Sequence, residues 1–113
     1  LLKAILRLLD NKQVKRCAKL VSSRKYRREE GLFVTEGQRL CEDAVRSGLK
    51  PVQIFIVEDM LEKCSAVLEQ SEQVFIITEE LSAKISDIPN DAIYSIANIG
   101  DSNEIKVGQA AIQ

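Results

Sequence analysis

The chain has 113 residues, which is enough for one compact domain and too few for two ordinary ones. Its side chains are 45% hydrophobic and 29% charged, as in a globular domain. The absence of histidine excludes a histidine-based catalytic triad. No apolar run reaches the roughly 18–20 residues that cross a bilayer, so we expect no membrane segment. The cytoplasmic location that we also expect follows from the cysteines, which are spaced as reduced thiols.

The net charge of −1 hides an uneven split along the chain. Residues 1–28 contain ten basic residues and one acidic residue, whereas residues 29–113 contain six basic and sixteen acidic residues. Such a division predicts one surface suited to a polyanion and another that repels it.

The first ten residues are apolar at Leu2, Ile5, Leu6 and Leu9, which is helical spacing. We therefore expect residues 1–10 to form a helical extension that packs on the domain or on a second copy. The domain itself is expected over residues 11–113.

A basic amphipathic helix is predicted next, with Asn11 as its N-cap. Its apolar positions follow the helical period, and its cations fall on the other side. The apolar set is Val14, Cys17, Ala18 and Val21, and the cations are Lys12, Lys15, Arg16 and Lys19.

The stretch SSRKYRREEG that follows is interpreted as a cationic loop. Tyr26 is a candidate for stacking on an unpaired base, and the surrounding arginines for gripping phosphate. The cations of the loop are Arg24, Lys25, Arg27 and Arg28. A solvated surface that only keeps the protein soluble is the competing reading. Eight cations without a carboxylate over residues 12–28 favour nucleic acid, because a solubilising surface usually mixes both signs.

Beyond residue 31, strands alternate with helices. Strands are predicted at residues 32–35, 53–57, 74–77 and 93–99, and helices around Leu40–Val45, over residues 58–70 and from Thr78 as a cap through Ile85. A turn is expected at residues 100–103, and residues 104–107 read as strand or tail. Nearly continuous apolar strands predict an α/β domain with a mainly parallel sheet covered on both faces.

The three cysteines, Cys17, Cys41 and Cys64, are too far apart for metal-ligand spacing and odd in number. Buried reduced thiols are the favoured reading, and no metal site is predicted. The glycines are scattered, so no phosphate-binding loop is indicated. Glu36 lies where a strand passes into a helix, a common ligand position. We favour a structural role instead, in which Glu36 accepts hydrogen bonds from the free N–H groups of the helix start and Gly37 allows a tight turn.

Two motifs, in order and spacing, resemble the N-terminal substrate-binding domain of SpoU (TrmH) family RNA methyltransferases. The resemblance is closest over residues 19–48 and extends loosely from residue 11 to residue 87. The motifs are Ser23-Arg24-Lys25-Tyr26-Arg27 and Phe33-Val34-Thr35-Glu36-Gly37. After residue 87 the chain departs from the family, with Ile88-Pro89-Asn90-Asp91 in place of a Thr-Pro-Gln-Gly-like turn.

The resemblance implies a three-layer α/β/α sandwich, similar to ribosomal and kink-turn RNA-binding proteins, that recruits ribosomal or transfer RNA. It implies that S-adenosylmethionine binding, ribose 2′-O-methylation and homodimer formation belong to a separate knotted domain. No catalytic motif of that domain occurs here, so we expect no catalytic residue and no cofactor in this chain. Two alternatives stay open, namely a stand-alone RNA-binding or ribosome-associated module and a protein-interaction domain that works through its acidic remainder.

Overall fold

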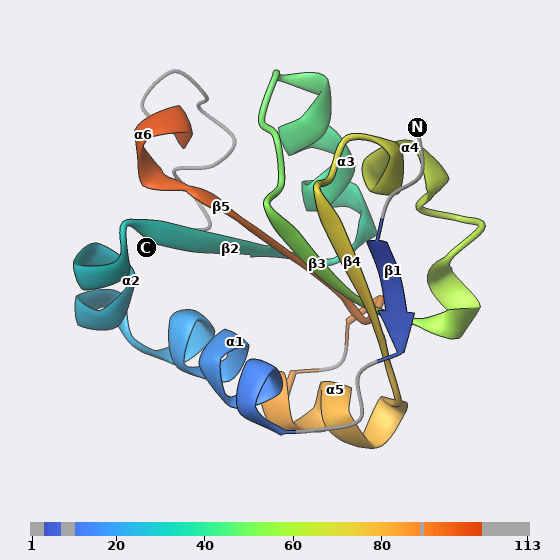
Figure 1. Ribbon diagram of the computed structural model, residues 1–113, viewed down its shortest axis with the longest axis horizontal. Coiled ribbons are helices and arrows are strands. Elements are labelled where there is room, and N and C mark those ends of the chain that lie inside the picture. Colours follow the sequence, from blue (N-terminus) through green and yellow to red (C-terminus); the bar gives the residue numbers. More distant parts are fainter. Residues whose placement is uncertain (1–3, 8–10, 89, 103–113) are drawn as a thin grey trace.

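The computed structural model describes residues 4–7, 11–88 and 90–102. Strands and helices alternate along most of the chain, as the apolar pattern predicts (Figure 1). In chain order the elements are β1 (Ala4–Arg7), α1 (Lys12–Ser22), α2 (Arg24–Glu30), β2 (Leu32–Glu36), α3 (Gln38–Arg46), β3 (Gln53–Val57), the 3-10 helix η1 (Glu58–Met60), α4 (Ser65–Glu69), β4 (Gln73–Ile77), α5 (Glu79–Ile85), β5 (Ile93–Asn98) and α6 (Ile99–Ser102).

The five described strands form one sheet in the order β1-β4-β3-β5-β2. The pairs β1–β4 and β3–β4 are parallel, and β5 is antiparallel to both β3 and β2. The sheet is therefore mixed. Four strands, β1 among them, run in one direction, but β5 lies between two of them in reverse, so parallel pairs do not predominate as predicted. An apolar strand pattern reads the same in either direction, so the sequence contains no signal for this reversal.

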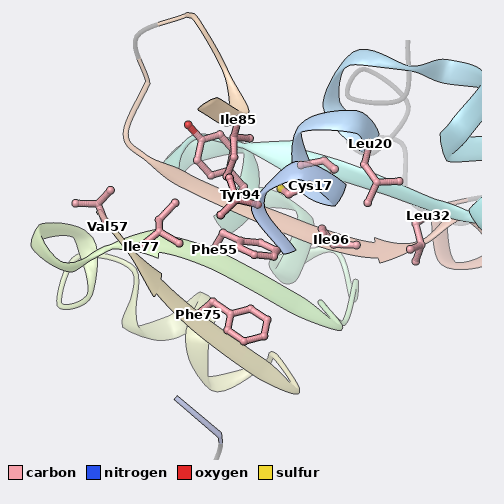
Figure 2. Close-up of a cluster of buried hydrophobic side chains, with 12 residues drawn as sticks. Cys17, Leu20, Leu32, Phe55, Val57, Phe75, Ile77, Ile85, Tyr94 and Ile96 are labelled. Carbon is pink, nitrogen blue, oxygen red and sulfur yellow. The ribbon is translucent and has the colours of Figure 1, made fainter. Parts of the chain in front are cut away.

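Helices cover both faces of the sheet, which confirms the α/β sandwich. On one face, Cys17 and Leu20 of α1 and Ile85 of α5 pack on strand residues that include Phe55 and Tyr94 (Figure 2). On the other face, α3 and α4 pack on the alternate strand residues, namely Ile54, Ile56 and Val74. Both sets of strand side chains are buried, which explains why the strands read as continuous apolar runs.

The helix predicted over residues 1–10 is wrong at residues 4–7, which are the part of this segment that the structure describes. Residues 4–7 form the edge strand β1, in register with β4 from Ala4↔Gln73 to Arg7↔Ile76, and no helix. Ile5 and Leu6 are each about half exposed. Their spacing fits a helix as well as a strand, and pairing to the open edge of β4 decides between them. Residues 1–3 and 8–10 lie outside the described residues, as do residues 104–107.

Two other segments also differ from expectation. The single helix predicted over residues 58–70 is instead η1, a turn and the five-residue α4. Met60 and Cys64 still both enter the core cluster beneath α3, as they would from one face of a continuous helix. The turn predicted at residues 100–103 begins as the short helix α6, which starts at Ile99. By contrast, Thr78 caps α5 as predicted, with its Oγ1 accepting from Leu81 N at 3.1 Å.

The three cysteines are buried and form no disulfide, which confirms the buried-thiol prediction. Burial raises the pKa of Cys41 to about 12 and that of Cys64 to about 11. Burial also raises the pKa of Cys17 well above its usual value. A thiol that holds its proton this tightly is a poor nucleophile and a poor metal ligand, so these residues act as small core side chains.

Candidate nucleic-acid interface

Helix α1 separates its charge from its apolar residues, as predicted. Val14, Cys17 and Leu20 are fully buried against the sheet. Lys12, Lys15 and Lys19 are exposed, and at 100° per residue they lie opposite the buried stripe. One side of α1 is thus core and the other is a row of three ammonium groups.

Asn11 stands at the N-cap position of α1, as predicted, and its carbonyl oxygen accepts from Lys15 N at 2.8 Å. Its side chain, however, makes no cap hydrogen bond.

The predicted cationic loop is a helix. Ser23 caps α2, because its Oγ accepts a hydrogen bond from Tyr26 N at 3.1 Å. Gly31 ends the helix in the left-handed conformation, at φ 69°, where an L side chain would be strained. The sequence pattern misses this helix because Tyr26 is its only apolar residue, which leaves no periodicity to detect. The Ser before the cations and the Gly after them were the available signals.

The four cations of α2 divide into two roles. Arg24, Lys25 and Arg28 are exposed, and they share the outward side of the helix. Arg27 is only 6% exposed. Its Nη1 donates to the carbonyl oxygens of Leu20, at 2.7 Å, and Val21, at 3.0 Å. A guanidinium at the carbonyl end of α1 stabilises that helix end and ties α2 to it, so Arg27 is a structural residue rather than a surface contact.

Tyr26 is half-buried and packs against the core cluster beneath α1. The Nζ of Lys19 lies 4.3 Å from the centre of its ring, within the range of a cation–π interaction. The structure therefore places Tyr26 in the contact between the two helices. The free stacking surface expected from the sequence is already occupied by these neighbours.

Arg16 belongs to a different neighbourhood from the lysines of α1. Its guanidinium donates to Gln53 Oε1 at 3.4 Å and forms an ion pair with Glu30 at 3.6 Å. Gln53 in turn donates to Gln73 Oε1 at 3.1 Å. Arg16 thus lines a cleft at the amino-terminal ends of β3 and β4, next to the exposed lysine row but partly neutralised.

The Phe33–Gly37 motif forms most of β2 and the turn into α3. Phe33 is fully buried, and Gly37 makes the tight turn predicted for it, at φ 93°. Glu36, however, accepts a hydrogen bond from Asn90 Nδ2 at 2.8 Å instead of from helix N–H groups. The N–H at the start of α3, that of Gln38, donates to Asp91 Oδ2 at 3.2 Å.

The sequence analysis missed the roles of Asn90 and Asp91. Asn90 also donates to the hydroxyl of Tyr94 at 3.2 Å, so it fastens the loop before β5 to two strands. The cluster of Pro, Asn and Asp at residues 89–91 is typical of a turn, but Glu36 and Gln38, which the side chains of Asn90 and Asp91 contact, lie more than fifty residues away in sequence.

The exposed cations of α1 and α2 are largely unneutralised. Within the described residues, Lys15, Lys19, Arg24, Lys25 and Arg28 form no ion pair, although the ammonium group of Lys19 lies over the ring of Tyr26. On the α3–α4 side of the sheet the exposed charge is mixed, and Arg46 is paired with Asp43 at 2.7 Å. The predicted electrostatic division between two surfaces is thus present in three dimensions, and the α1–α2 surface is suited to a polyanion.

Residues 11–91 match the family model of MRM3-like substrate-binding domains. The chain belongs to this family. The match spans α1 through the loop before β5, and it confirms the resemblance to the substrate-binding domain of SpoU/TrmH enzymes. A search of curated proteins found no match. None of the helices in the described part of this MRM3-like domain is long and apolar enough to cross a membrane.

Solved structures similar to this MRM3-like domain include three methyltransferases. An RNA 2′-O ribose methyltransferase has 25% identity and a TM-score of 0.68, and the match covers 84% of this chain and 37% of that one. An AdoMet-bound rRNA methyltransferase from Sinorhizobium meliloti has 24% identity and a TM-score of 0.63, and the match covers 83% of this chain and 36% of that one. The SpoU methyltransferase AviRb from Streptomyces viridochromogenes, in complex with AdoMet, has 16% identity and a TM-score of 0.66, and the match covers 80% of this chain and 36% of that one. The chain thus spans little more than a third of each of these proteins.

Proposed function

We propose that this domain binds RNA through the exposed cations of α1 and α2 and presents it to a ribose 2′-O-methyltransferase domain. The observation that carries the proposal is the lysine row of α1, opposite a fully buried stripe and continued by three cations on α2, in a member of a substrate-binding domain family. The proposed contacts are Lys12, Lys15, Lys19, Arg24, Lys25 and Arg28, with Arg16 at their margin.

The geometry supports phosphate contacts more than base contacts at this surface. Lysine is a compact point charge with rotatable donors, and arginine can grip phosphate oxygens with two parallel hydrogen bonds. Both residue types stand on helices whose other side is anchored in the core. Phosphate contacts position an RNA without reading its sequence, so base recognition would come from elsewhere in the enzyme.

The remaining parts of the proposed enzyme are expected outside this chain. Methyl transfer from S-adenosylmethionine and homodimer formation would reside in a separate domain. Two of the similar structures are described as holding AdoMet, which supports this division of labour. Ribosomal RNA is the favoured substrate over transfer RNA, since one of these proteins is described as an rRNA methyltransferase. A cytoplasmic location stays a prediction.

Salt-dependent RNA binding by the 113-residue chain tests the proposal. Because each phosphate contact releases counterions, the slope of log K against log salt is expected to be about −0.7 to −0.9 per contact. The triple variant Lys12→Gln, Lys15→Gln and Lys19→Gln should flatten that slope by about two to three units. Fluorescence anisotropy with a labelled ribosomal RNA fragment at several salt concentrations measures it.

The matched control removes three exposed cations from elsewhere on the surface: Arg39→Gln, Lys50→Gln and Lys63→Gln. This variant has the same net charge as the lysine-row variant and should keep the slope of the unmodified chain. Equal slopes for both triple variants, or an affinity that does not respond to salt, would contradict the proposed interface.

A further inference from the structure

The aromatic residues of this chain are almost entirely withdrawn from its surface. There is no Trp, and four of the five aromatic rings are buried, namely Phe33, Phe55, Phe75 and Tyr94. Proteins that bind single-stranded nucleic acid usually combine a basic groove with exposed aromatic rings, on which unpaired bases stack. The basic surface of α1 and α2 lacks that second component.

Tyr26, the fifth ring, is the one aromatic residue within the basic surface. It packs on the core cluster beneath α1, and Lys19 Nζ lies 4.3 Å from its ring centre. An incoming base would have to displace that ammonium group and lose the cation–π contact. Tyr26 is therefore better placed to hold Lys19 in position than to receive a base.

The joint between α1 and α2 is held on several sides. Arg27 bonds two carbonyl oxygens of α1, and Ser23 N donates to Lys19 O at 2.9 Å while its Oγ caps α2. After α2, Gly31 O accepts from Ile99 N at 2.9 Å. The cations consequently stand at fixed helical spacings, and the lysine row spans about 10 Å from Lys12 to Lys19. Fixed spacings favour a ligand whose phosphates are also fixed.

We infer that the α1–α2 surface binds a base-paired, double-helical segment of its RNA rather than unpaired bases. This inference rests on the proposed function and names the structural class of its ligand. Duplex RNA is recognised mainly by its shape and through phosphate and 2′-hydroxyl contacts, for which exposed lysines and arginines suffice. An unpaired strand would find charge here but no ring on which to stack.

Anisotropy titrations of the 113-residue chain with two labelled RNAs test the inference. One is a 20-base-pair duplex of mixed sequence, and the other is a 20-nucleotide oligouridine, which stays unpaired. The duplex is expected to bind about tenfold tighter or more at the same salt concentration. Tyr26→Leu should change the oligouridine affinity by no more than about twofold, because no base stacks on this ring.

The Arg27→Met variant tests the role of the fixed joint, with its folding checked by circular dichroism. If it folds, its preference for the duplex should fall while its affinity for oligouridine stays the same. If it does not fold, Tyr26→Leu takes its place, because this change releases Lys19 from the ring. The preference of this variant for the duplex should fall while its affinity for oligouridine stays the same.

Oligouridine binding as tight as the duplex would overturn the inference. So would a loss of about fivefold or more in oligouridine affinity on Tyr26→Leu, which is what removing one stacked base costs. In both cases RNA binding through the lysine row, and with it the proposed function, would stand. If neither RNA bound in a salt-dependent way, the proposed function would fail as well.

Discussion

The helical layers on the two faces of the sheet are built alike on the inside and differently on the outside. Helix α1 buries Val14, Cys17 and Leu20, and α3 buries Cys41 and Ala44. Toward solvent, α1 presents a row of lysines, whereas α3 presents a paired Arg46–Asp43 and a Gln38–Glu42 hydrogen bond. Core packing therefore places both helices equally well, and it says nothing about which layer binds a ligand.

The two layers differ in how many of their exposed charges are paired with a charge of opposite sign. In the α3–α4 layer, neighbouring side chains of opposite sign satisfy one another. In the α1–α2 layer, α2 carries its carboxylates only at its last two positions, and Glu30 there is used by Arg16. Surplus charge of one sign opposes folding slightly through self-repulsion, so its retention in one layer indicates a ligand that neutralises it.

Exchanging charge between the two layers should have the largest effect. The variant changes Lys12, Lys15 and Lys19 to Glu and the exposed Asp59, Glu62 and Glu69 to Lys, which leaves the net charge at −1. RNA affinity at low salt should fall by about a hundredfold or more, because the interface becomes repulsive. Anisotropy titration measures it. Recovery of normal affinity would mean that total charge matters and its position does not.

Arg27→Met should come next, as a loss of stability. It removes two hydrogen bonds from the carbonyl end of α1, at about 1–3 kcal/mol for each buried partner left without one, so the free energy of unfolding should fall by about 2–4 kcal/mol. Urea denaturation followed by circular dichroism gives this value. Arg28→Met, one residue on and exposed, is the control and should change stability by less than about 0.5 kcal/mol. Similar losses for both variants would refute the structural role of Arg27.

Raising the pH should destabilise both layers, because each buries at least one thiol. The folded state raises the pKa of Cys41 to about 12 and of Cys64 to about 11, whereas unfolded thiols titrate near 8.5. The stability from these protonated thiols is therefore fully present below about pH 8.5 and is lost as the pH rises toward 11. The loss is at most about 1.4 kcal/mol per pH unit for each thiol.

Urea midpoints measured between pH 8 and pH 10.5 check this dependence. In the Cys64→Ala variant the urea midpoint should decline less steeply with pH, because one of the titrating thiols is absent. The difference between the two curves gives the contribution of Cys64 alone. An identical decline in the variant would show that Cys64 does not titrate in this way.

The smallest effect is expected in the loop before β5. Asn90→Ala removes the hydrogen bonds to Glu36 and Tyr94 and should cost about 1 kcal/mol, with RNA affinity unchanged. Glu36→Gln, which keeps an acceptor for Asn90, should cost less. Thermal unfolding and anisotropy on the same samples test both. A tenfold loss of RNA affinity in either variant would extend the interface to this loop.

Much of the fold was predictable from local patterns. The strand at Gln53–Val57 and the Thr78 cap of α5 were anticipated, because apolar runs and cap residues act over a few positions. Residues 4–7 and the cationic stretch after Ser23 were not. A four-residue apolar segment fits either period, and α2 has no apolar stripe to detect. The reversal of β5 was not predicted either, because its antiparallel pairing with β2 and β3 joins strands that are distant in sequence.

The sequence by itself determined that one surface would be basic, since charge and helical period together place Lys12, Lys15 and Lys19 away from the core. Only the tertiary structure decided what each remaining cation and Tyr26 do. Arg27 is buried because its guanidinium donates hydrogen bonds to carbonyl oxygens in the last turn of α1, which have no partner within the helix. Arg16 is drawn aside by Glu30 and Gln53. These partners approach only when the helices pack on the sheet, so no local pattern could have separated the buried guanidinium from the exposed ones.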